Sequence, residues 1–84
     1  MKIKWQPKAT KQLIKLKDKS VINRINNAVL TLINFPEVIN VKALLNHDYG
    51  YRLRVGDYRV LFDVQETVEI ISIEEVKKRD ERTY

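Results

Sequence analysis

The sequence predicts an α+β fold with the element order β-α-α-β-β-β, a largely antiparallel sheet and two helices packed on one face of that sheet. Residues 49–64, YGYRLRVGDYRVLFDV, have the pattern of a β-hairpin. Residues 7–35 carry two apolar stripes at helical spacing, and residues 68–73, VEIISI, are apolar at nearly every position, as in a buried strand. The length, 84 residues, allows a single domain over residues 1–84.

The N-terminal residues predict a short strand followed by a short helix. Ile3 and Trp5 alternate with lysines, as in a strand with one buried face. Pro7 suits the first turn of a helix, where its missing N–H is no loss. Ala9, Leu13 and Leu16 then follow at helical spacing, and we expect this helix to end near residue 18.

A second helix is expected from Ser20, which we take as its N-cap, to the residue before Pro36. Its apolar stripe consists of Val21, Ile22, Ile25, Ala28, Val29, Leu32 and Ile33. The short connection between the helices predicts an antiparallel helical pair. Each helix has one stripe to bury, so both are expected to cover the apolar face of the sheet.

The second half of the chain predicts strands. Residues 37–48 are expected to form a loop with an extended piece around Val41 and Ala43. Gly56-Asp57 is the signature of a tight II′ hairpin turn, in which Arg54 lies opposite Arg59. A turn at residues 65–66, a strand over 68–73 and a polar tail from Glu74 complete the chain.

The two faces of the predicted hairpin differ sharply in character. Alternation places an apolar set on one face: Tyr51, Leu53, Val55, Tyr58, Val60 and Phe62. The other face carries Arg52, Arg54 and Arg59. Like charges opposite each other destabilise a sheet, so this face predicts an anionic ligand. The alternative is that the arginines only keep the sheet surface hydrated.

Composition excludes several classes of chemistry. The chain has no cysteine and one histidine, which rules out thiolate nucleophiles, a histidine pair and a conventional zinc site. The carboxylates do not have the spacing of a metal site, and we expect no metal and no cofactor. Glu74 and Glu75 are expected to be solvated. His47 is expected to lie in a loop, either without a role or as an auxiliary RNA contact.

Charge predicts the kind of partner. The net charge of +5 and the pI of about 9.6 favour nucleic acid, an anionic membrane surface or an acidic protein. No apolar run approaches the roughly 20 residues that span a bilayer, and residues 1–11 lack a signal-peptide core. We therefore expect a cytoplasmic protein without a membrane partner.

A second basic cluster follows the last predicted strand. It consists of Lys77, Lys78, Arg79 and Arg82, with Tyr84 two residues further on. Arginine holds phosphate oxygens with two hydrogen bonds, and tyrosine stacks on unpaired bases. The cluster favours RNA as the ligand, although a solvated C-terminus explains it equally simply.

YRLRVGDYRVLF, followed by a buried strand and KKRDERTY, closely resembles the RelE/ParE superfamily of type II toxins, and most nearly its RelE branch. The resemblance covers almost the whole chain. It implies a ribosome-dependent mRNA interferase, which cleaves mRNA in the ribosomal A site by attack of the 2′-hydroxyl on the adjacent phosphate, without a metal. It also implies an acidic cognate antitoxin, and a toxin–antitoxin complex that binds its own operator DNA through the antitoxin.

The resemblance also implies roles for individual residues. Arg54, Arg59, Arg79 and Tyr84 match catalytic positions: Arg59 contacts the scissile phosphate, Arg79 is associated with protonating the leaving oxygen, and Tyr84 stacks on the substrate base. Arg52 matches a basic position next to Arg54, and RNA binding is expected of it and, from the basic cluster after the last strand, of Lys77, Lys78 and Arg82. RelE itself has lysines where this chain has Arg52 and Arg54, and arginine stays protonated at neutral pH. The identity of the general base therefore stays open.

Two other readings remain. A ParE-like toxin shares the fold and inhibits DNA gyrase without nuclease activity. Such toxins generally lack the interferase residues, so the presence of Arg54, Arg59, Arg79 and Tyr84 together favours the nuclease. The third possibility is a non-enzymatic partner that acts only with its antitoxin in repression.

Overall fold

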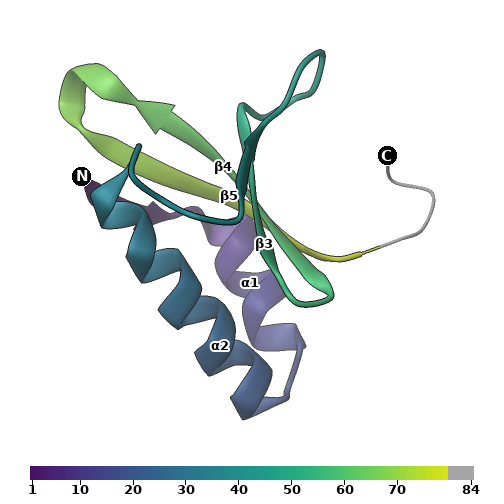
Figure 1. Ribbon diagram of the computed structural model, residues 1–84. Helices are drawn as coiled ribbons and strands as arrows, with labels where there is room; N and C mark the ends of the chain where they lie inside the picture. Colours follow the sequence, from purple (N-terminus) through teal and green to yellow (C-terminus); the bar gives the residue numbers. More distant parts are fainter. Residues whose placement is uncertain (80–84) are drawn as a thin grey trace.

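In the computed structural model, which describes residues 1–79, the predicted helices and strands form a sheet with two accompanying helices (Figure 1). The strands are β1 (Lys2–Trp5), β2 (Val41–Ala43), β3 (Tyr51–Val55), β4 (Tyr58–Gln65) and β5 (Ile70–Lys78). The helices are α1 (Pro7–Lys15) and α2 (Lys19–Leu30), and 3₁₀ turns follow at Thr31–Asn34 and Glu66–Val68. The α+β class and the β-α-α-β-β-β order are confirmed.

The sheet has the strand order β1-β5-β4-β3-β2. Only β1 and β5 are parallel, and the other neighbouring pairs are antiparallel. The extended piece expected near Val41 is β2, which pairs with β3 and forms one edge of the sheet. The longest strands, β4 and β5, therefore lie inside the sheet and carry most of its buried side chains.

The helices begin and end for local reasons. Pro7 stands in the first turn of α1 as expected. The N-cap of α2 is Asp18 and not Ser20: the Asp18 carboxylate accepts hydrogen bonds from the backbone N–H groups of Ser20, at 3.0 Å, and Val21, at 3.3 Å. The N-cap therefore lies two residues earlier than predicted, because the Asp18 carboxylate reaches two of the unpaired N–H groups in the first turn.

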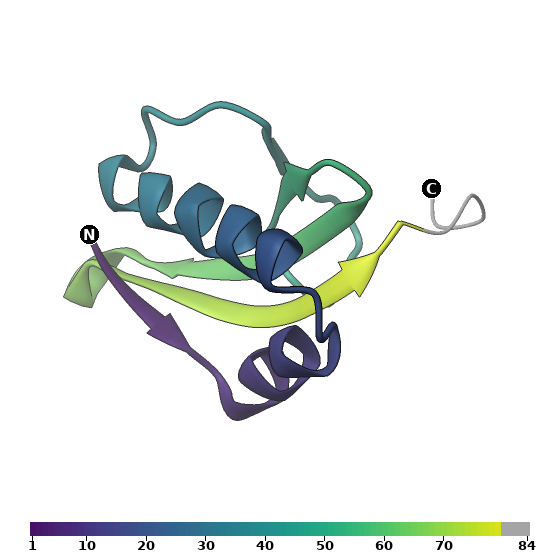
Figure 2. The same cartoon turned by 90° about the horizontal axis from the view of Figure 1, so that it is seen from below.

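The core lies between α2 and the sheet, and α1 lies beside β5 (Figures 1 and 2). Phe62 is at its centre, fully buried, with its ring stacked on Tyr51 at 5.4 Å between centroids and edge-to-face with Phe35 at 6.2 Å. The other buried apolar residues of this cluster are Ala9, Leu13, Ile25, Val29, Leu32, Leu53, Val55, Val60, Ile71, Ile73 and Val76. Both predicted helical stripes thus contribute to one core.

The last strand is longer than predicted. The expected polar tail from Glu74 is instead the second half of β5, which continues to Lys78 because β4 pairs with it along its whole length. The turn expected at residues 65–66 is a 3₁₀ turn over Glu66–Val68 that ends at Glu69 with a positive φ of 54°, so the strand begins at Ile70 and not at Val68. Pairing with the long strand β4 therefore decides that residues 74–78 form a strand, although most of them are polar.

The edge of β5 changes its neighbour halfway along. β1 pairs only with Ile70–Ile73, and the backbone N–H of Gln6 donates to the carbonyl of Ile73 at 2.9 Å. Beyond that point the N–H of Val76 donates to the side-chain oxygen of Gln12 on α1, at 2.7 Å. A helix side chain thus takes the place of a strand. Within residues 1–79, neither helix has the length and apolar character needed to cross a bilayer.

Candidate functional site

The β3–β4 hairpin has the predicted register. Val55 pairs with Tyr58, Arg54 with Arg59, and Leu53 with Val60. Gly56 has a φ of 57°, and Asp57 is not among the described residues with positive φ, as a II′ turn requires. Leu53, Val55 and Val60 are buried in the core, so the arginines project from the opposite face.

Register across three strands brings three cations into one line. Arg59 on β4 pairs with Arg54 on β3 on one side and with Lys77 on β5 on the other. Paired residues of antiparallel strands have Cα atoms about 5 Å apart and project from the same face. We call Arg54, Arg59 and Lys77 the basic row, and the sheet face that carries it the polar face.

Arg52 belongs to the same face, one step along β3 from the basic row. It pairs with Leu61, which in turn pairs with Glu75. Leu61 is only 2% exposed, so this part of the polar face is not the open surface that the sequence suggested.

The remaining predicted site residues are distributed differently. Lys78 pairs with Tyr58, which places it on the face opposite to Lys77. Arg79 follows β5, and its backbone N–H donates to the carbonyl of Asp57, so it lies beside the hairpin turn. Arg82 and Tyr84 lie outside the described residues, so their predicted roles stay predictions.

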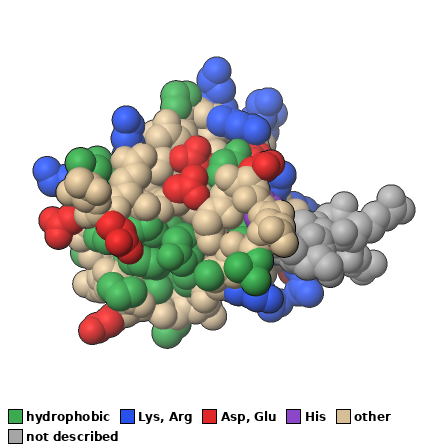
Figure 3. All heavy atoms as spheres, turned by 90° about the horizontal axis from the view of Figure 1, so that it is seen from above, with side chains coloured by type: hydrophobic (Ala, Val, Ile, Leu, Met, Phe, Trp, Pro, Cys, Tyr) green, Lys and Arg blue, Asp and Glu red, His purple; other side chains and the backbone are tan. Residues whose placement is uncertain are grey.

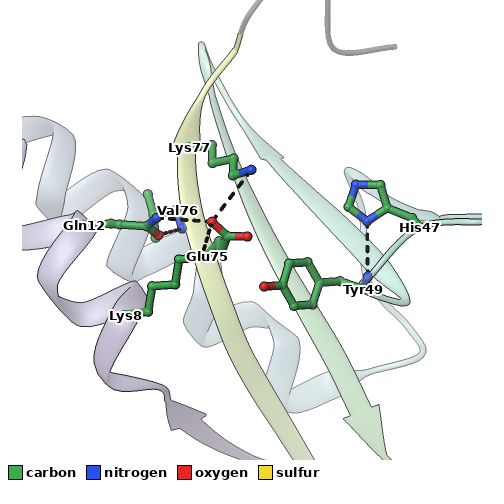
Figure 4. Close-up of polar contacts among 7 residues, drawn as sticks. All are labelled: Lys8, Gln12, His47, Tyr49, Glu75, Val76 and Lys77. Carbon is green, nitrogen blue, oxygen red and sulfur yellow. Dashed lines mark hydrogen bonds and ion pairs between the residues drawn. The ribbon is translucent and has the colours of Figure 1, made fainter.

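Glu75 is the main correction at residue level. The sequence analysis expected it to be solvated, yet it is 6% exposed on the polar face. Its Oε1 accepts a hydrogen bond from the side chain of Gln12 at 3.2 Å and lies 3.3 Å from Nζ of Lys8 and 3.7 Å from Nζ of Lys77 (Figure 4). The carboxylate therefore joins α1 to one end of the basic row.

These contacts control the ionisation of Glu75. Burial alone would raise the pKa of this carboxyl, but hydrogen bonds from Gln12, Tyr49 and Lys8 and the charge of Lys77 outweigh it. The pKa of Glu75 is consequently held below its ordinary value. The group is a buried carboxylate that remains ionised at neutral pH.

A β-bulge explains why Glu75 reaches this face. Leu61 pairs with Glu75 but the next residue, Phe62, pairs with Ile73, so Glu74 has no partner of its own. If side chains had alternated regularly from Ile73, Glu75 would point into the core. The extra residue at the bulge exchanges the two faces for the rest of the strand, so Val76 is buried in the core instead. The sequence holds a signal for this, because apolar residues stand at 71 and 73 and then at 76.

The loop before β3 brings Tyr49 and His47 next to these residues. Its ends are closed by the N–H of Leu44 donating to the carbonyl of Gly50 at 2.9 Å, and the N–H of Gly50 donates to the Asp63 carboxylate at 2.6 Å. Tyr49 points from this loop toward Glu75, and Nδ1 of His47 accepts from the N–H of Tyr49 at 3.1 Å (Figure 4). No sequence pattern singled out Tyr49, because its position depends on how this loop closes.

Tyr49 and Glu75 affect each other electrostatically. Hydrogen bonding to the Glu75 carboxylate is the main reason that the pKa of Tyr49 is raised, and partial burial and the charges of Glu75, Glu74 and Asp48 act in the same direction. Tyr49 is therefore a neutral hydroxyl whose proton is directed to a carboxylate. Tyr49 is half-buried, whereas Glu75 is buried.

The arrangement is suited to binding an anion. Seen from above, most of the lysine and arginine side chains in that view lie toward the top and right of the surface, whereas an apolar area lies at lower left (Figure 3). The basic row supplies guanidinium groups that bind phosphate oxygens with paired hydrogen bonds. Over residues 1–79, no group of three or more histidine, aspartate or glutamate side chains is placed to hold a metal ion.

Comparison with known proteins places this geometry in context. The model of the family described as ParE toxin of type II toxin-antitoxin system, parDE, matches residues 3–82. Comparison with curated proteins gives no significant match.

Several solved structures share the fold of this chain. The RelE–RelB complex from Pyrococcus horikoshii OT3 is similar with a TM-score of 0.78 and 28% identity, over 95% of this chain and 96% of that one. The RelBE2 toxin–antitoxin complex from Mycobacterium tuberculosis gives 0.76 and 18%, over 93% and 96%. The YoeB dimer from Staphylococcus aureus gives 0.68 and 21%, over 95% and 98%.

Proposed function

The chain belongs to the ParE toxin family of type II toxin–antitoxin systems, within the RelE/ParE superfamily. We propose, from the residues of its polar face, that it is a toxin that cleaves mRNA on the ribosome. The observation that carries the proposal is the basic row, in which Arg54, Arg59 and Lys77 lie side by side across three strands. A protein selected for stability alone would separate such like charges.

The basic row suits phosphodiester cleavage by the RNA's own 2′-hydroxyl. This reaction needs no nucleophile from the protein, only alignment of the attack and neutralisation of the charge that grows on the phosphate. Arg54 and Arg59 would hold the phosphate oxygens, and Arg52 and Lys77 would bind the neighbouring backbone. Arg79 would assist the departing oxygen and Tyr84 would stack on a base, as the resemblance to the RelE branch implies.

The partners follow from charge and from the related structures. Two of these are complexes with RelB. We propose that an acidic antitoxin covers the polar face of this +5 chain and that the complex binds its operator DNA through the antitoxin. The site of action would be the cytoplasm, where ribosomes and mRNA meet.

Cleavage can be tested on a defined message. Primer extension on a translated mRNA, with purified ribosomes present or absent, should show toxin-dependent cuts within codons only when ribosomes are present. Equal cutting of naked RNA would contradict ribosome dependence. Absence of cleavage in both reactions would contradict nuclease function.

The family match itself favours one alternative, because the matching model describes ParE toxins. Such a toxin would inhibit DNA gyrase without cutting RNA. A supercoiling assay with purified gyrase and the same protein preparation separates the two functions. Inhibition of supercoiling by a protein that leaves translated mRNA intact would establish the alternative.

A further inference from the structure

The proposed cleavage lacks a group that takes the proton from the attacking 2′-hydroxyl. Guanidinium groups stay protonated at neutral pH, so the arginines of the polar face do not accept a proton readily. Among the other ionisable groups of that face, the buried carboxylate of Glu75 and the hydroxyl of Tyr49 lie next to each other and have no role in phosphate binding. The following inference rests on the proposed RNA cleavage.

The two oxygens of Glu75 have different surroundings. Oε1 receives Gln12 at 3.2 Å and lies within 4 Å of the Lys8 and Lys77 ammonium groups. The other oxygen points toward the hydroxyl of Tyr49 (Figure 4). Three donors thus hold the carboxylate in one orientation and leave its second oxygen directed at the tyrosine.

Burial decides which of the two can touch RNA. Glu75 is 6% exposed, so a ribose does not reach its carboxylate. Tyr49 is half-buried and so more exposed than Glu75, and it points toward that carboxylate from the loop that leads into β3. A substrate bound on the polar face therefore meets the tyrosine hydroxyl, and the carboxylate only through it.

We propose that Tyr49 and Glu75 together accept the 2′-hydroxyl proton, Tyr49 as the group that contacts the ribose and Glu75 as the residue that positions it and receives its proton. The 2′-hydroxyl proton passes to Oη of Tyr49 while the Tyr49 proton passes to Glu75. The 2′-oxygen forms its bond to phosphorus and the bond from phosphorus to the 5′-oxygen breaks. The products are a 2′,3′-cyclic phosphate and a 5′-hydroxyl, whose proton comes from water; the resulting hydroxide is neutralised by the proton that Glu75 returns to solvent.

The electrostatics agree with this geometry. The lowered pKa of Glu75 keeps the carboxylate in the ionised form that a proton acceptor needs, while making it a weaker base, and the raised pKa of Tyr49 keeps the hydroxyl protonated between turnovers. Lys8 faces Glu75 from α1 and Lys77 from β5, while Glu74 and Asp48 act on Tyr49. Arg52 on β3 and Arg59 on β4 project from the same face.

The test uses single-turnover cleavage of a message programmed on ribosomes. Tyr49→Phe and Glu75→Gln should each lower the cleavage rate at saturating toxin by about a hundredfold or more, the range for general acid–base groups. The toxin concentration for half-maximal rate should stay within about twofold, because binding depends on the basic row. Tyr58→Phe and Glu66→Gln, which alter the same residue types away from the pair, should cleave at the wild-type rate.

A second measurement separates proton transfer from a structural role. The double variant Tyr49→Phe/Glu75→Gln should cleave no more slowly than the slower single variant, because two residues that act as one unit lose their function once. If Glu75→Gln does not fold, the rate of Tyr49→Phe alone decides the matter, since that change removes only the hydroxyl.

Three outcomes would overturn the inference. One is wild-type rates in Tyr49→Phe; another is a loss confined to the half-maximal toxin concentration; the third is additive losses in the double variant. Failure of the proposed function looks different, because the wild-type protein itself would then leave the message uncut.

Discussion

At the scale of single residues, burial separates those that hold the fold from those available to a ligand. Arg54 is exposed on the polar face, whereas Phe62 is fully enclosed on the other side of the same hairpin. Exposed side chains contribute little to stability and buried ones contribute much. Substitution of an exposed polar-face residue should therefore change cleavage and not stability, whereas substitution of a buried core residue should change stability.

Arg54→Ala should leave the thermal midpoint nearly unchanged, with a change in unfolding free energy within about 0.5 kcal/mol, as at other surface sites. Cleavage should fall by about a hundredfold, because one preorganised charge contact to the phosphate is lost. Lys19→Ala, which removes an exposed charge at the start of α2, is the matched control and should cleave normally. A large loss of stability in Arg54→Ala would contradict its assignment to the polar face.

Phe62→Ala should have the reverse effect on stability. Its ring is fully buried and contacts both Tyr51 and Phe35, so truncation should lower the unfolding free energy by about 3–5 kcal/mol. The single tryptophan, Trp5, packs against the core and reports unfolding in urea by fluorescence. Val68→Ala, at a position 58% exposed, should shift the urea midpoint only slightly.

At the scale of elements, the hairpin, its turn and the first half of the last strand were predictable, but the second half of that strand was not. Gly56-Asp57 between alternating runs specifies both turn type and register, so the facing of Arg54 and Arg59 followed directly from the sequence. The second half of β5 is polar, and its strand state depends on pairing with β4, which no local pattern encodes.

Gly56→Ala tests the turn. Gly56 has a positive φ, and a Cβ there would lie 3.0 Å from the guanidinium nitrogens of Arg24 on α2. The substitution should destabilise the protein by about 1 kcal/mol or more through backbone strain, with the contact adding to it. In an Arg24→Ala background only the contact is relieved, so part of the loss should remain. Gly50→Ala, at a position without positive φ, should be milder.

Asp18 tests the start of α2. Its side chain accepts hydrogen bonds from Ser20 and Val21, chiefly the Ser20 hydroxyl, and these lower the pKa of Asp18. A lowered pKa in the folded state means that the stabilisation is present above the unfolded-state pKa and disappears as pH falls through the folded-state value. Asp18→Ala should lower the urea midpoint at neutral pH. Asp18→Asn should retain most of the capping but lose this acid dependence.

At the scale of the whole molecule, the net charge and the arginine face of the hairpin were readable from the sequence, but the place of Lys77 beside Arg59 was not. The net charge of +5 predicted an anionic partner, and the basic row gives that charge a position. The Tyr49–Glu75 pair was missed because it joins a loop to a bulged strand 26 positions away, and a shift of phase within β5 sets its geometry. A periodic pattern describes residues within one helix or strand, so it does not reveal a pair of residues so far apart in the sequence.

Binding of an acidic antitoxin should depend on salt. If its carboxylates lie against the polar face, raising the salt concentration should weaken binding, because screening shortens the range of exposed charge interactions to about 3 Å at 1 M ionic strength. Titration calorimetry at several salt concentrations measures this. Arg54→Ala should reduce the salt dependence, while an affinity insensitive to salt would place the antitoxin elsewhere on the toxin.

The hydrogen bond between Gln12 and Val76 affects whether molecules of this protein associate with one another at high concentration. A strand edge with unsatisfied N–H and carbonyl groups recruits strands from other chains and seeds fibrils. β1 ends at Trp5, so the second half of β5 has no strand neighbour on the edge away from β4, and the Gln12 side chain accepts the hydrogen bond of the Val76 backbone N–H there. One amide on a helix thus guards against self-association along the strand that also carries Glu75 and Lys77.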